Sequence, residues 1–127
     1  MIEIYLAIDG DDVGHRLEYF MLVNERESLN QFSITFQSSM DWLVEKLTHE
    51  LGATIIFSGG DNLLAVMNNE NLPIELIENI RTDFAIKSHC TLSVGLGYTI
   101  RQAYFALKLA KASGKNCIRN FKEFADG

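Results

Sequence analysis

The sequence predicts an α+β domain in which helices pack on one face of a mainly antiparallel sheet. Short apolar runs typical of strands alternate with longer segments whose apolar residues recur at helical spacing. Glycine, proline or polar residues separate these segments. The 127 residues are 47% apolar and 22% charged, which indicates one folded domain over residues 1–127 rather than a disordered chain.

The N-terminal part predicts one strand and two helices. Residues 2–8 (IEIYLAI) form a mostly buried strand, and Asp11 or Asp12 caps a short helix that follows. Residues 24–28 are polar and connect to a long helix, which Ser28 caps and Gly52 ends. The apolar residues of the long helix at helical spacing are Leu29, Phe32, Phe36, Met40, Leu43, Val44, Leu47 and Leu51.

The middle of the chain predicts a hairpin and a third helix. Residues 53–57 and 63–67 form two strands, and residues 58–62 are short enough to be the turn between them. After a polar loop at 68–71, Pro73 fits the first turn of a helix that runs through Phe84.

The C-terminal part predicts a strand, a helix and a short edge strand. Residues 91–98 form the strand, and Gly95 and Gly97 fall on one of its faces, where a backbone or a ligand could approach closely. A helix over residues 101–113 then stops at Gly114, and residues 116–121 add the edge strand.

Composition excludes several classes of function. The net charge of −6 argues against binding duplex nucleic acid, which requires a basic face. Cys90 and Cys117 lie in no metal-binding spacing, so we expect two small thiols in a reducing cytoplasm. The N-terminus lacks the pattern of a signal peptide, and no stretch of 18 apolar residues predicts a membrane span.

Two short patterns carry the chemical information. Asp9 directly follows the first predicted strand, and Asp61 follows the pair Gly59-Gly60 in the predicted hairpin turn. Carboxylates beside a bare backbone suit Mg²⁺ or Mn²⁺ carrying a nucleoside triphosphate, because such ions take one or two carboxylates plus substrate phosphates. We therefore predict Asp9 and Asp61 as metal ligands, with the Gly10 carbonyl oxygen as a third ligand.

Four motifs in order resemble those of nucleotide-cyclase and polymerase palm domains. Asp9 resembles their first metal-binding acid, residues 59–62 (GGDN) the GGDEF/GGDD turn, residues 93–95 (SVG) the SIG strand of GGDEF diguanylate cyclases, and residues 106–116 (ALKLAKASGKN) their ALYxAKxxGxN helix end. The set spans nearly the whole chain. At this size the chain looks most like a minimal CRISPR polymerase (mCpol).

This resemblance implies a ferredoxin-like palm that makes a cyclic dinucleotide signal, from ATP, in bacterial anti-phage defence, and a separate effector protein that reads the signal. By the same resemblance Lys111 is a phosphate-binding lysine. Lys108 stands where the family has tyrosine and is unassigned.

Two positions depart from the family pattern. Asn62 replaces the second acid of GGDD and offers a neutral carbonyl oxygen, which weakens a second metal site. Guanine-specific relatives carry an asparagine eight residues after the first acid, where this chain has Leu17, and a leucine cannot hydrogen-bond a guanine edge.

Two roles are compatible with the sequence at several positions. Asp11 and Asp12 are a helix cap or metal ligands. Ser58, Gly59 and Gly60 make the turn and also let phosphates approach the backbone.

Three functions remain open. The first is a nucleotidyltransferase in which Asp9 and Asp61 hold the metal and Lys111 neutralises the leaving pyrophosphate. One palm holds one substrate site, so we expect a homodimer in which two substrates meet. The alternatives are a cyclohydrolase-like purine triphosphate hydrolase and an inactive palm that senses nucleotides.

Overall fold

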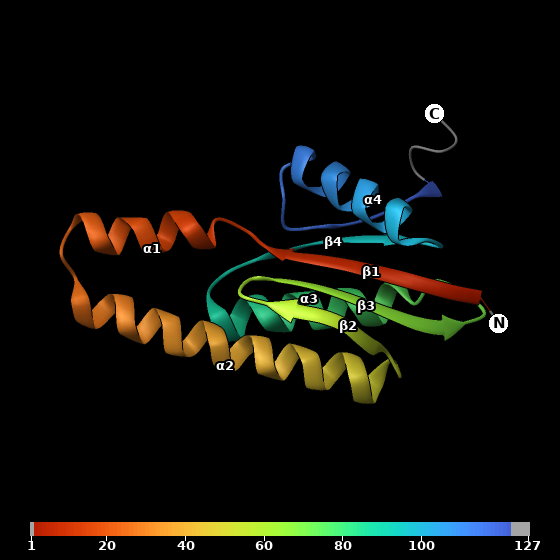
Figure 1. The fold of residues 1–127 in the computed structure, drawn as a ribbon, viewed down its shortest axis with the longest axis horizontal. Helices are drawn as coiled ribbons and strands as arrows, with labels where there is room; N and C mark the ends of the chain where they lie inside the picture. The colour runs from red at the N-terminus through yellow and green to blue at the C-terminus, as the bar shows by residue number, and fades with distance from the viewer. Residues whose placement is uncertain (1, 123–127) are drawn as a thin grey trace.

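A five-stranded sheet with the order β2-β3-β1-β4-β5 organises residues 2–122, the part of the chain that the computed structural model describes (Figure 1). All neighbouring strands are antiparallel except β4 and β5, which run parallel. The elements in chain order are β1 (Ile2–Gly10), α1 (Val13–Leu22), α2 (Arg26–Glu50), β2 (Thr54–Gly59), β3 (Asn62–Asn69), α3 (Ile74–Ser88), β4 (Leu92–Gly97), α4 (Ile100–Ala112) and β5 (Ile118–Asn120). The predicted α+β class with a mainly antiparallel sheet is confirmed.

The prediction that the helices share one face of the sheet is wrong. In β1, Ile4, Leu6 and Ile8 belong to the core between the sheet and the helices α2 and α3. Tyr5 and Ala7 pack with α4 on the other face of the sheet. Figure 1 shows α4 above the sheet and α2 and α3 below it. The sheet has this second covered face because the intervening residues of β1 are themselves apolar.

Glycines of β4 explain how closely α4 approaches the sheet. A Cβ atom on Gly95 would lie 2.2 Å from the backbone nitrogen of Leu107, and one on Gly97 would lie 2.5 Å from that of Ala103. No side chain fits in either place. Of the two options that the sequence left for these glycines, the structure shows the approach of a backbone.

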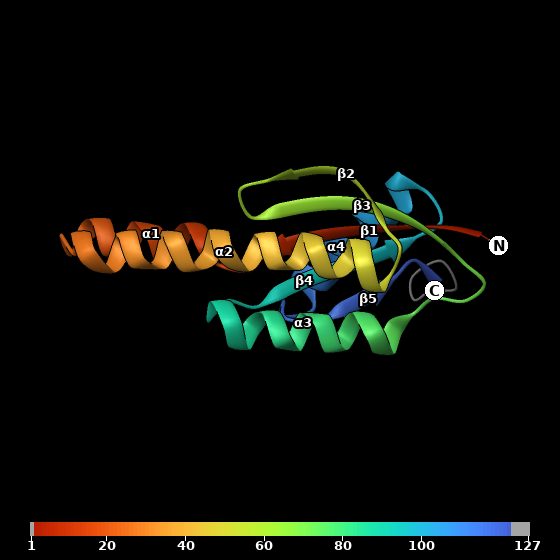
Figure 2. The same ribbon diagram turned by 90° about the horizontal axis from the view of Figure 1, so that it is seen from below.

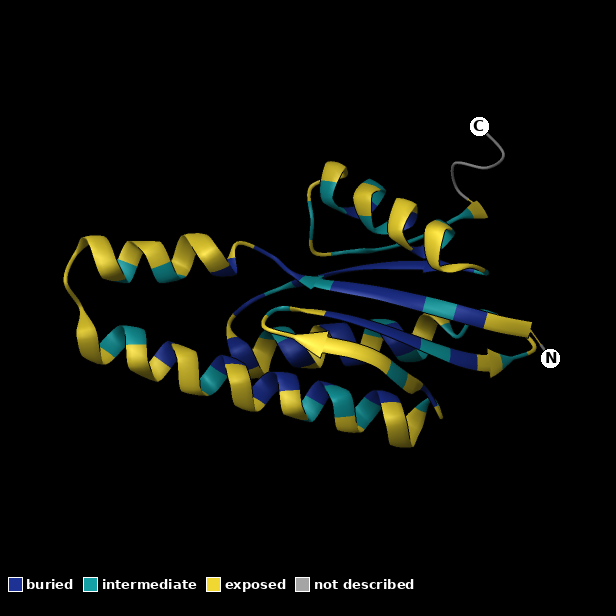
Figure 3. Cartoon of the chain, viewed as in Figure 1, coloured by how far each residue is buried: buried dark blue, intermediate teal, exposed yellow. Residues whose placement is uncertain are grey.

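The larger core lies between the sheet and the two helices α2 and α3. Leu43 and Phe84 are fully buried there, and Phe36 meets Phe84 edge to face with 5.9 Å between ring centroids. Figure 3 shows buried residues along β1 and β4, whereas β2 at the edge is mostly exposed. Among the described residues, no helix is both long and apolar enough to cross a membrane.

The side-chain caps predicted for the N-termini of α1 and α2 are wrong. The helix α2 begins at Arg26, so Ser28 lies inside its first turn, and no side chain caps it. Asp12 precedes α1 with a φ of 59° and caps nothing, because its carboxylate pairs with Lys115 instead. Asp11 is also no cap, since other donors use its carboxylate, as described below.

Strand ends differ from the prediction by at most two residues, whereas α3 continues past Phe84 to Ser88. The strand β1 continues past residue 8 to Gly10 because β3 and β4 both pair with its end, so Asp9 lies within the strand. Pro73 immediately precedes α3. In Figures 1 and 2, α1 and the beginning of α2 project past the sheet at the end where β1 runs into α1.

Candidate functional site

The acids predicted as metal ligands meet in one pocket of about 440 Å³, which we call the acid pocket. It lies where β1 passes into α1, beside the turn between β2 and β3. Its charged and glycine residues are Asp9, Gly10, Asp12, Gly14, Glu18, Asp61, Lys111 and Lys115. Asp9 and Asp61 therefore line the same pocket, and no packed apolar core separates them.

Strand pairing positions the two acids. Asp9 lies opposite Asn62 in the β1–β3 register, and the next backbone nitrogen, that of Gly10, donates to the Asp61 carbonyl oxygen at 2.8 Å. Gly60 forms the turn with a φ of 58°, a conformation that glycine adopts without strain. A Cβ atom on Gly10 would lie 2.9 Å from Val13 Cγ2 and 3.3 Å from Asp61 Cβ, so glycine here lets the hairpin turn close against β1.

Asp61 is a carboxylate in an unfavourable place for its charge. Burial raises its pKa, and the negative charge of Asp9 raises it further. A positive ion bound between the two acids would relieve this repulsion.

The ammonium group of Lys111 occupies this region in the structure. Its Nζ lies 3.0 Å from Asp9 Oδ2 and 2.8 Å from Asp11 Oδ1, and it donates to the Gly10 carbonyl oxygen at 3.2 Å. Burial alone would lower the pKa of Lys111, but its contacts with Asp11 and Asp9 outweigh burial and raise the pKa. Lys111 therefore stays protonated, as a cation among three oxygen atoms.

Asp11 is buried and has a complete set of partners. Thr91 Oγ1 and Ser93 Oγ each donate to its carboxylate at 2.7 Å, the backbone nitrogen of Asn116 donates at 2.9 Å, and Lys111 completes the set. Burial alone would raise the pKa of Asp11, but the hydrogen bonds from Lys111, Thr91, Ser93 and Asn116 outweigh burial and lower it. These contacts favour a structural role over the metal-ligand reading, because they use both oxygen atoms.

Asp12 lies at the rim of the acid pocket. Its Oδ1 accepts from Lys115 Nζ at 2.5 Å, and this hydrogen bond lowers the pKa of Asp12. Both side chains are well exposed, so the pair contributes little to stability.

The donor set fits a hard divalent cation that also binds phosphate. Within residues 2–122 no cluster of three or more His, Cys, Asp or Glu side chains could hold a metal alone. Asp9, Asp61 and the Gly10 carbonyl oxygen supply two carboxylates and a carbonyl, which is the usual protein share for Mg²⁺ when substrate phosphates and waters complete the shell. The Lys111 ammonium against two of these groups shows that a cation is favoured there.

The other predicted residues divide among neighbouring surfaces. Gly60 lines a second pocket with Asp61, and Asn62 lies with Asp9 on the α4 side of the sheet. Ser58 and Gly59 are exposed at the end of β2 and are not among the described residues that line the acid pocket. The structure therefore brings Asp9, Gly10, Asp61 and Lys111 together and leaves Ser58 and Gly59 at the periphery.

The second pocket, of about 300 Å³, lies between α1 and α2 and opens beside Asp61. Its apolar side chains are Val13, Leu17, Phe32 and Phe36, and its polar ones besides Asp61 are Ser33 and Gln37. Leu17 thus lies in the pocket wall, where it presents no group to a purine edge. The lining of this second pocket suits a flat apolar ring with few polar contacts.

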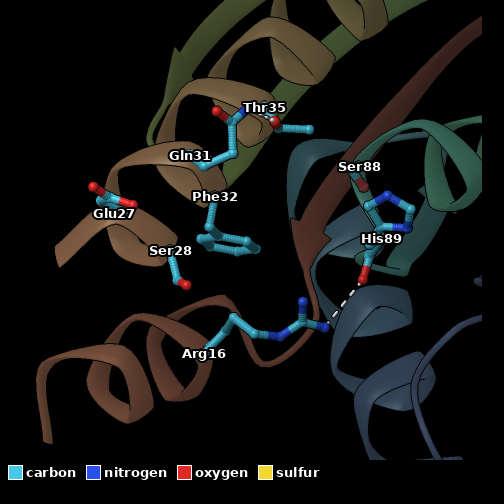
Figure 4. Close-up of a pocket in the computed structure, with 8 residues that line it drawn as sticks. All are labelled: Arg16, Glu27, Ser28, Gln31, Phe32, Thr35, Ser88 and His89. Carbon is cyan, nitrogen blue, oxygen red and sulfur yellow. Dashed lines mark hydrogen bonds between the residues drawn. The ribbon is translucent and has the colours of Figure 1, made fainter. Parts of the chain in front are cut away.

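A larger polar pocket of about 700 Å³ lies on the other side of Phe32 and contains none of the predicted site residues (Figure 4). Arg16 reaches across it and donates to the His89 carbonyl oxygen at 3.1 Å, while its guanidinium carbon lies 5.3 Å from the centroid of the Phe32 ring. Through these contacts Arg16 links α1 to the end of α3.

Sequence reasoning missed the residues that hold Asp11 and Lys111 in place. Arg81 of α3 donates to the Asn116 carbonyl oxygen at 3.0 Å, and this contact links α3 to the loop that follows α4. Arg81 also donates to Glu78 within α3. Thr91 and Ser93 alternate at the start of β4, and this spacing of two was the available signal that both hydroxyls share a face.

Comparisons with known proteins identify the fold and the family of the chain. No curated protein sequence matches the chain. A GGEEF domain of a diguanylate cyclase from Vibrio cholerae is 21% identical, with a TM-score of 0.67 over 94% of this chain and 82% of that chain. Csm1, solved in a Csm1–Csm4 cassette with cA4, is 21% identical with a TM-score of 0.66 over 91% of this chain and 20% of that chain.

A bacterial light-regulated adenylyl cyclase has a TM-score of 0.59 at 14% identity, over 86% of this chain and 70% of that chain. At these identities the similarity shows a shared palm fold. The sequence model of the minimal CRISPR polymerase domain matches residues 5–121, almost the whole chain. The chain belongs to the minimal CRISPR polymerase (mCpol) family.

Proposed function

We propose that this palm is a metal-dependent nucleotidyltransferase that joins purine nucleoside triphosphates, ATP in preference, into a cyclic dinucleotide. The observation that carries the proposal is the acid pocket, where Asp9 and Asp61 share one cavity and a lysine ammonium rests on Asp9 and the Gly10 carbonyl oxygen. A cation-favouring set of oxygens beside a glycine turn is what a triphosphate with its metal requires.

Asp9, Asp61 and the Gly10 carbonyl oxygen are the groups that would hold Mg²⁺ or Mn²⁺. Such an ion lowers the pKa of a nearby hydroxyl and offsets the charge of the departing pyrophosphate. In the reaction, a ribose hydroxyl oxygen forms a bond to the α-phosphorus, and the bond from that phosphorus to the β-phosphate oxygen breaks. Pyrophosphate leaves with the bonding electrons, and the hydroxyl proton passes to solvent.

The chain's own residues orient this reaction. Lys111 exchanges its contact with Asp9 for the triphosphate, while Asp11 keeps it in place by the 2.8 Å contact. The bare backbone of Gly59 and Gly60 lets the phosphates approach the turn. The pocket between α1 and α2 receives the base, and Leu17 in its wall supports adenine over guanine.

The direct test is to incubate the protein with each triphosphate and Mn²⁺ and to identify the product by mass. A cyclic dinucleotide with two equivalents of pyrophosphate supports the proposal. A ring-opened base would identify a hydrolase instead. Binding of ATP with no release of pyrophosphate, unchanged in Asp61→Asn, would identify a nucleotide sensor.

We propose that the cyclic product is a signal in anti-phage defence and that a separate effector protein reads it. We further propose that two copies of the chain act together, because each palm presents one set of metal-binding acids. Specific activity should fall on dilution through the dissociation range of the dimer, as measured by sedimentation. Full specific activity in a strictly monomeric sample contradicts the dimer and leaves the transferase proposal intact.

A further inference from the structure

A groove of about 230 Å³ lies on the α4 side of the hairpin, across the sheet from the pocket between α1 and α2. Phe57 of β2 and Tyr104 and Lys108 of α4 line it, Ala7 and Leu64 are among its apolar residues, and Asp9 lies in its wall. We call it the α4 groove. None of these side chains except Asp9 has a role in the transferase described above.

The α4 groove and the pocket between α1 and α2 flank the two acids from opposite faces of the sheet. Asp61 lines the pocket between the helices, Asp9 lines the α4 groove, and both acids line the acid pocket. A transfer between two nucleotides needs a donor and an acceptor that reach one reaction centre from different directions. The fold supplies two such approaches within one chain.

The side chains of the α4 groove suit a base. Phe57 and Tyr104 are 51% and 49% exposed, so both rings are accessible to a ligand in the groove. Aromatic side chains stack on nucleobases of any sequence. The groove is smaller than the roughly 300–1,000 Å³ of a whole-ligand pocket, so it fits part of a ligand such as one base.

The charges beside the α4 groove also fit a nucleotide. Lys108 Nζ lies 5.2 Å from the centroid of the Tyr104 ring, and Lys111 lines the same groove. Lys111 is paired with Asp9 and Asp11, so Lys108 beside the exposed Tyr104 ring is the cation that this surface offers to a ligand. An anionic ligand with an aromatic ring complements this surface in both charge and shape.

We propose that the α4 groove binds the base of the acceptor nucleotide, whose ribose hydroxyl attacks the α-phosphorus of the donor. The inference rests on the proposed function, since it assigns the second substrate of the same reaction. The bonds that form and break are those given above: hydroxyl oxygen to α-phosphorus forms, and α-phosphorus to pyrophosphate breaks. Because the groove belongs to the same chain as the acids, it acts in a monomer or in a dimer.

The experiment separates donor from acceptor by chemistry. The donor probe is 2′,3′-dideoxy-ATP, which has no hydroxyl to attack with, and the acceptor probe is AMP, which has no pyrophosphate to lose. Together with Mn²⁺ they form one linear dinucleotide and one pyrophosphate. We expect Tyr104→Ala and Phe57→Ala to raise the KM for AMP about 10-fold, through loss of a stacking partner, and to leave the KM for the donor unchanged.

The matched control is Phe105→Ala. Phe105 follows Tyr104 on the same helix and is 47% exposed, but it is not among the described residues that line the α4 groove. It should leave both KM values unchanged. The inference is overturned if the KM for AMP is unchanged in Tyr104→Ala, if Phe105→Ala raises it equally, or if Tyr104→Ala dissociates a dimer and raises the KM for the donor as well.

Failure of the proposed function has a different signature. If the wild-type protein forms no product from any triphosphate, the transferase proposal fails, and photo-crosslinking with 8-azido-AMP then tests the groove alone. Labelling of the tryptic peptide that contains Tyr104 in the wild type, and its loss in Tyr104→Ala, supports a nucleotide groove. Absence of labelling overturns it.

Discussion

Asp11 and Asp61 lie at the same end of the sheet, yet their carboxylates are in opposite situations. Asp11 is buried among four donors that lower its pKa, whereas Asp61 has its pKa raised by burial and by the charge of Asp9. A carboxylate whose oxygens are already used holds the structure together. A carboxylate whose ionised form is disfavoured by burial and by a negatively charged neighbour favours a bound cation.

The largest expected effect comes from removing the charge of the two acids proposed to bind the metal. Asp9→Asn and Asp61→Asn should each reduce the rate of pyrophosphate release about 1,000-fold or more, because a neutral amide binds a divalent cation poorly. The measurement is pyrophosphate release with ATP and Mn²⁺, with circular dichroism to verify folding.

The control is Asp12→Asn, which removes an acid from the rim of the same pocket. It should change the rate less than about 5-fold, because Asp12 already pairs with Lys115 at the surface. Equal losses in all three variants would contradict the distinction between the two proposed metal ligands and the acid at the rim.

The next effect concerns stability. Asp11→Ala should lower the free energy of unfolding by about 3 kcal/mol, because it leaves Thr91, Ser93 and the half-buried Lys111 without their shared acceptor. Denaturant unfolding measures this. Asp12→Asn is the control, because asparagine tolerates the positive φ of residue 12, and it should leave the free energy of unfolding almost unchanged. A large loss in this control and none in Asp11→Ala would reverse our assignment.

A smaller effect concerns competition between Lys111 and a divalent cation for the same oxygen atoms. Lys111→Met should tighten Mn²⁺ binding in the absence of nucleotide by about 10-fold, because the ammonium no longer occupies Asp9 and the Gly10 carbonyl oxygen. Titration calorimetry or Mn²⁺ electron paramagnetic resonance reports this without turnover. Lys115→Met keeps Lys111 and should leave the affinity unchanged, and weaker Mn²⁺ binding by Lys111→Met would count against the exchange.

The smallest effect is a pH dependence of stability in metal-free buffer. The folded-state pKa of Asp61 lies above its unfolded value, so Asp61 favours the folded state less as pH rises through that folded pKa. Asp61→Asn should therefore be slightly more stable than wild type at neutral pH, with the difference vanishing in acid. Thermal melts from pH 3 to pH 7 with EDTA measure it, and a variant that is less stable at neutral pH contradicts the raised pKa.

The hairpin and its acids were predictable because their signals are local. A strand pattern followed by Gly59, Gly60 and Asp61 specifies the turn, and Asp9 ends an apolar run, so neither needs distant information. The order of all nine elements follows from the same kind of pattern.

The interior of the site was not predictable in the same way. The contacts of Asp11 come from residues 80 to 105 positions further along the chain, and no local pattern reports them. The covering of both sheet faces depends on α4 docking over Gly95 and Gly97, which the sequence left open between a backbone and a ligand. The cap at Ser28 failed because α2 begins two residues earlier with no capping side chain.

The contacts of Asp11 with Lys111 and Asn116 affect the order in which the site forms during synthesis of the chain. These partners are 100 and 105 positions away, so the repelling acids emerge long before the segment that neutralises them. A nascent chain that ends before α4 carries Asp9 and Asp61 but neither Lys111 nor the backbone nitrogen of Asn116 that restrain Asp11. The carboxylate of Asp11 therefore gains its full set of partners only after α4 and the loop that follows it have been synthesised.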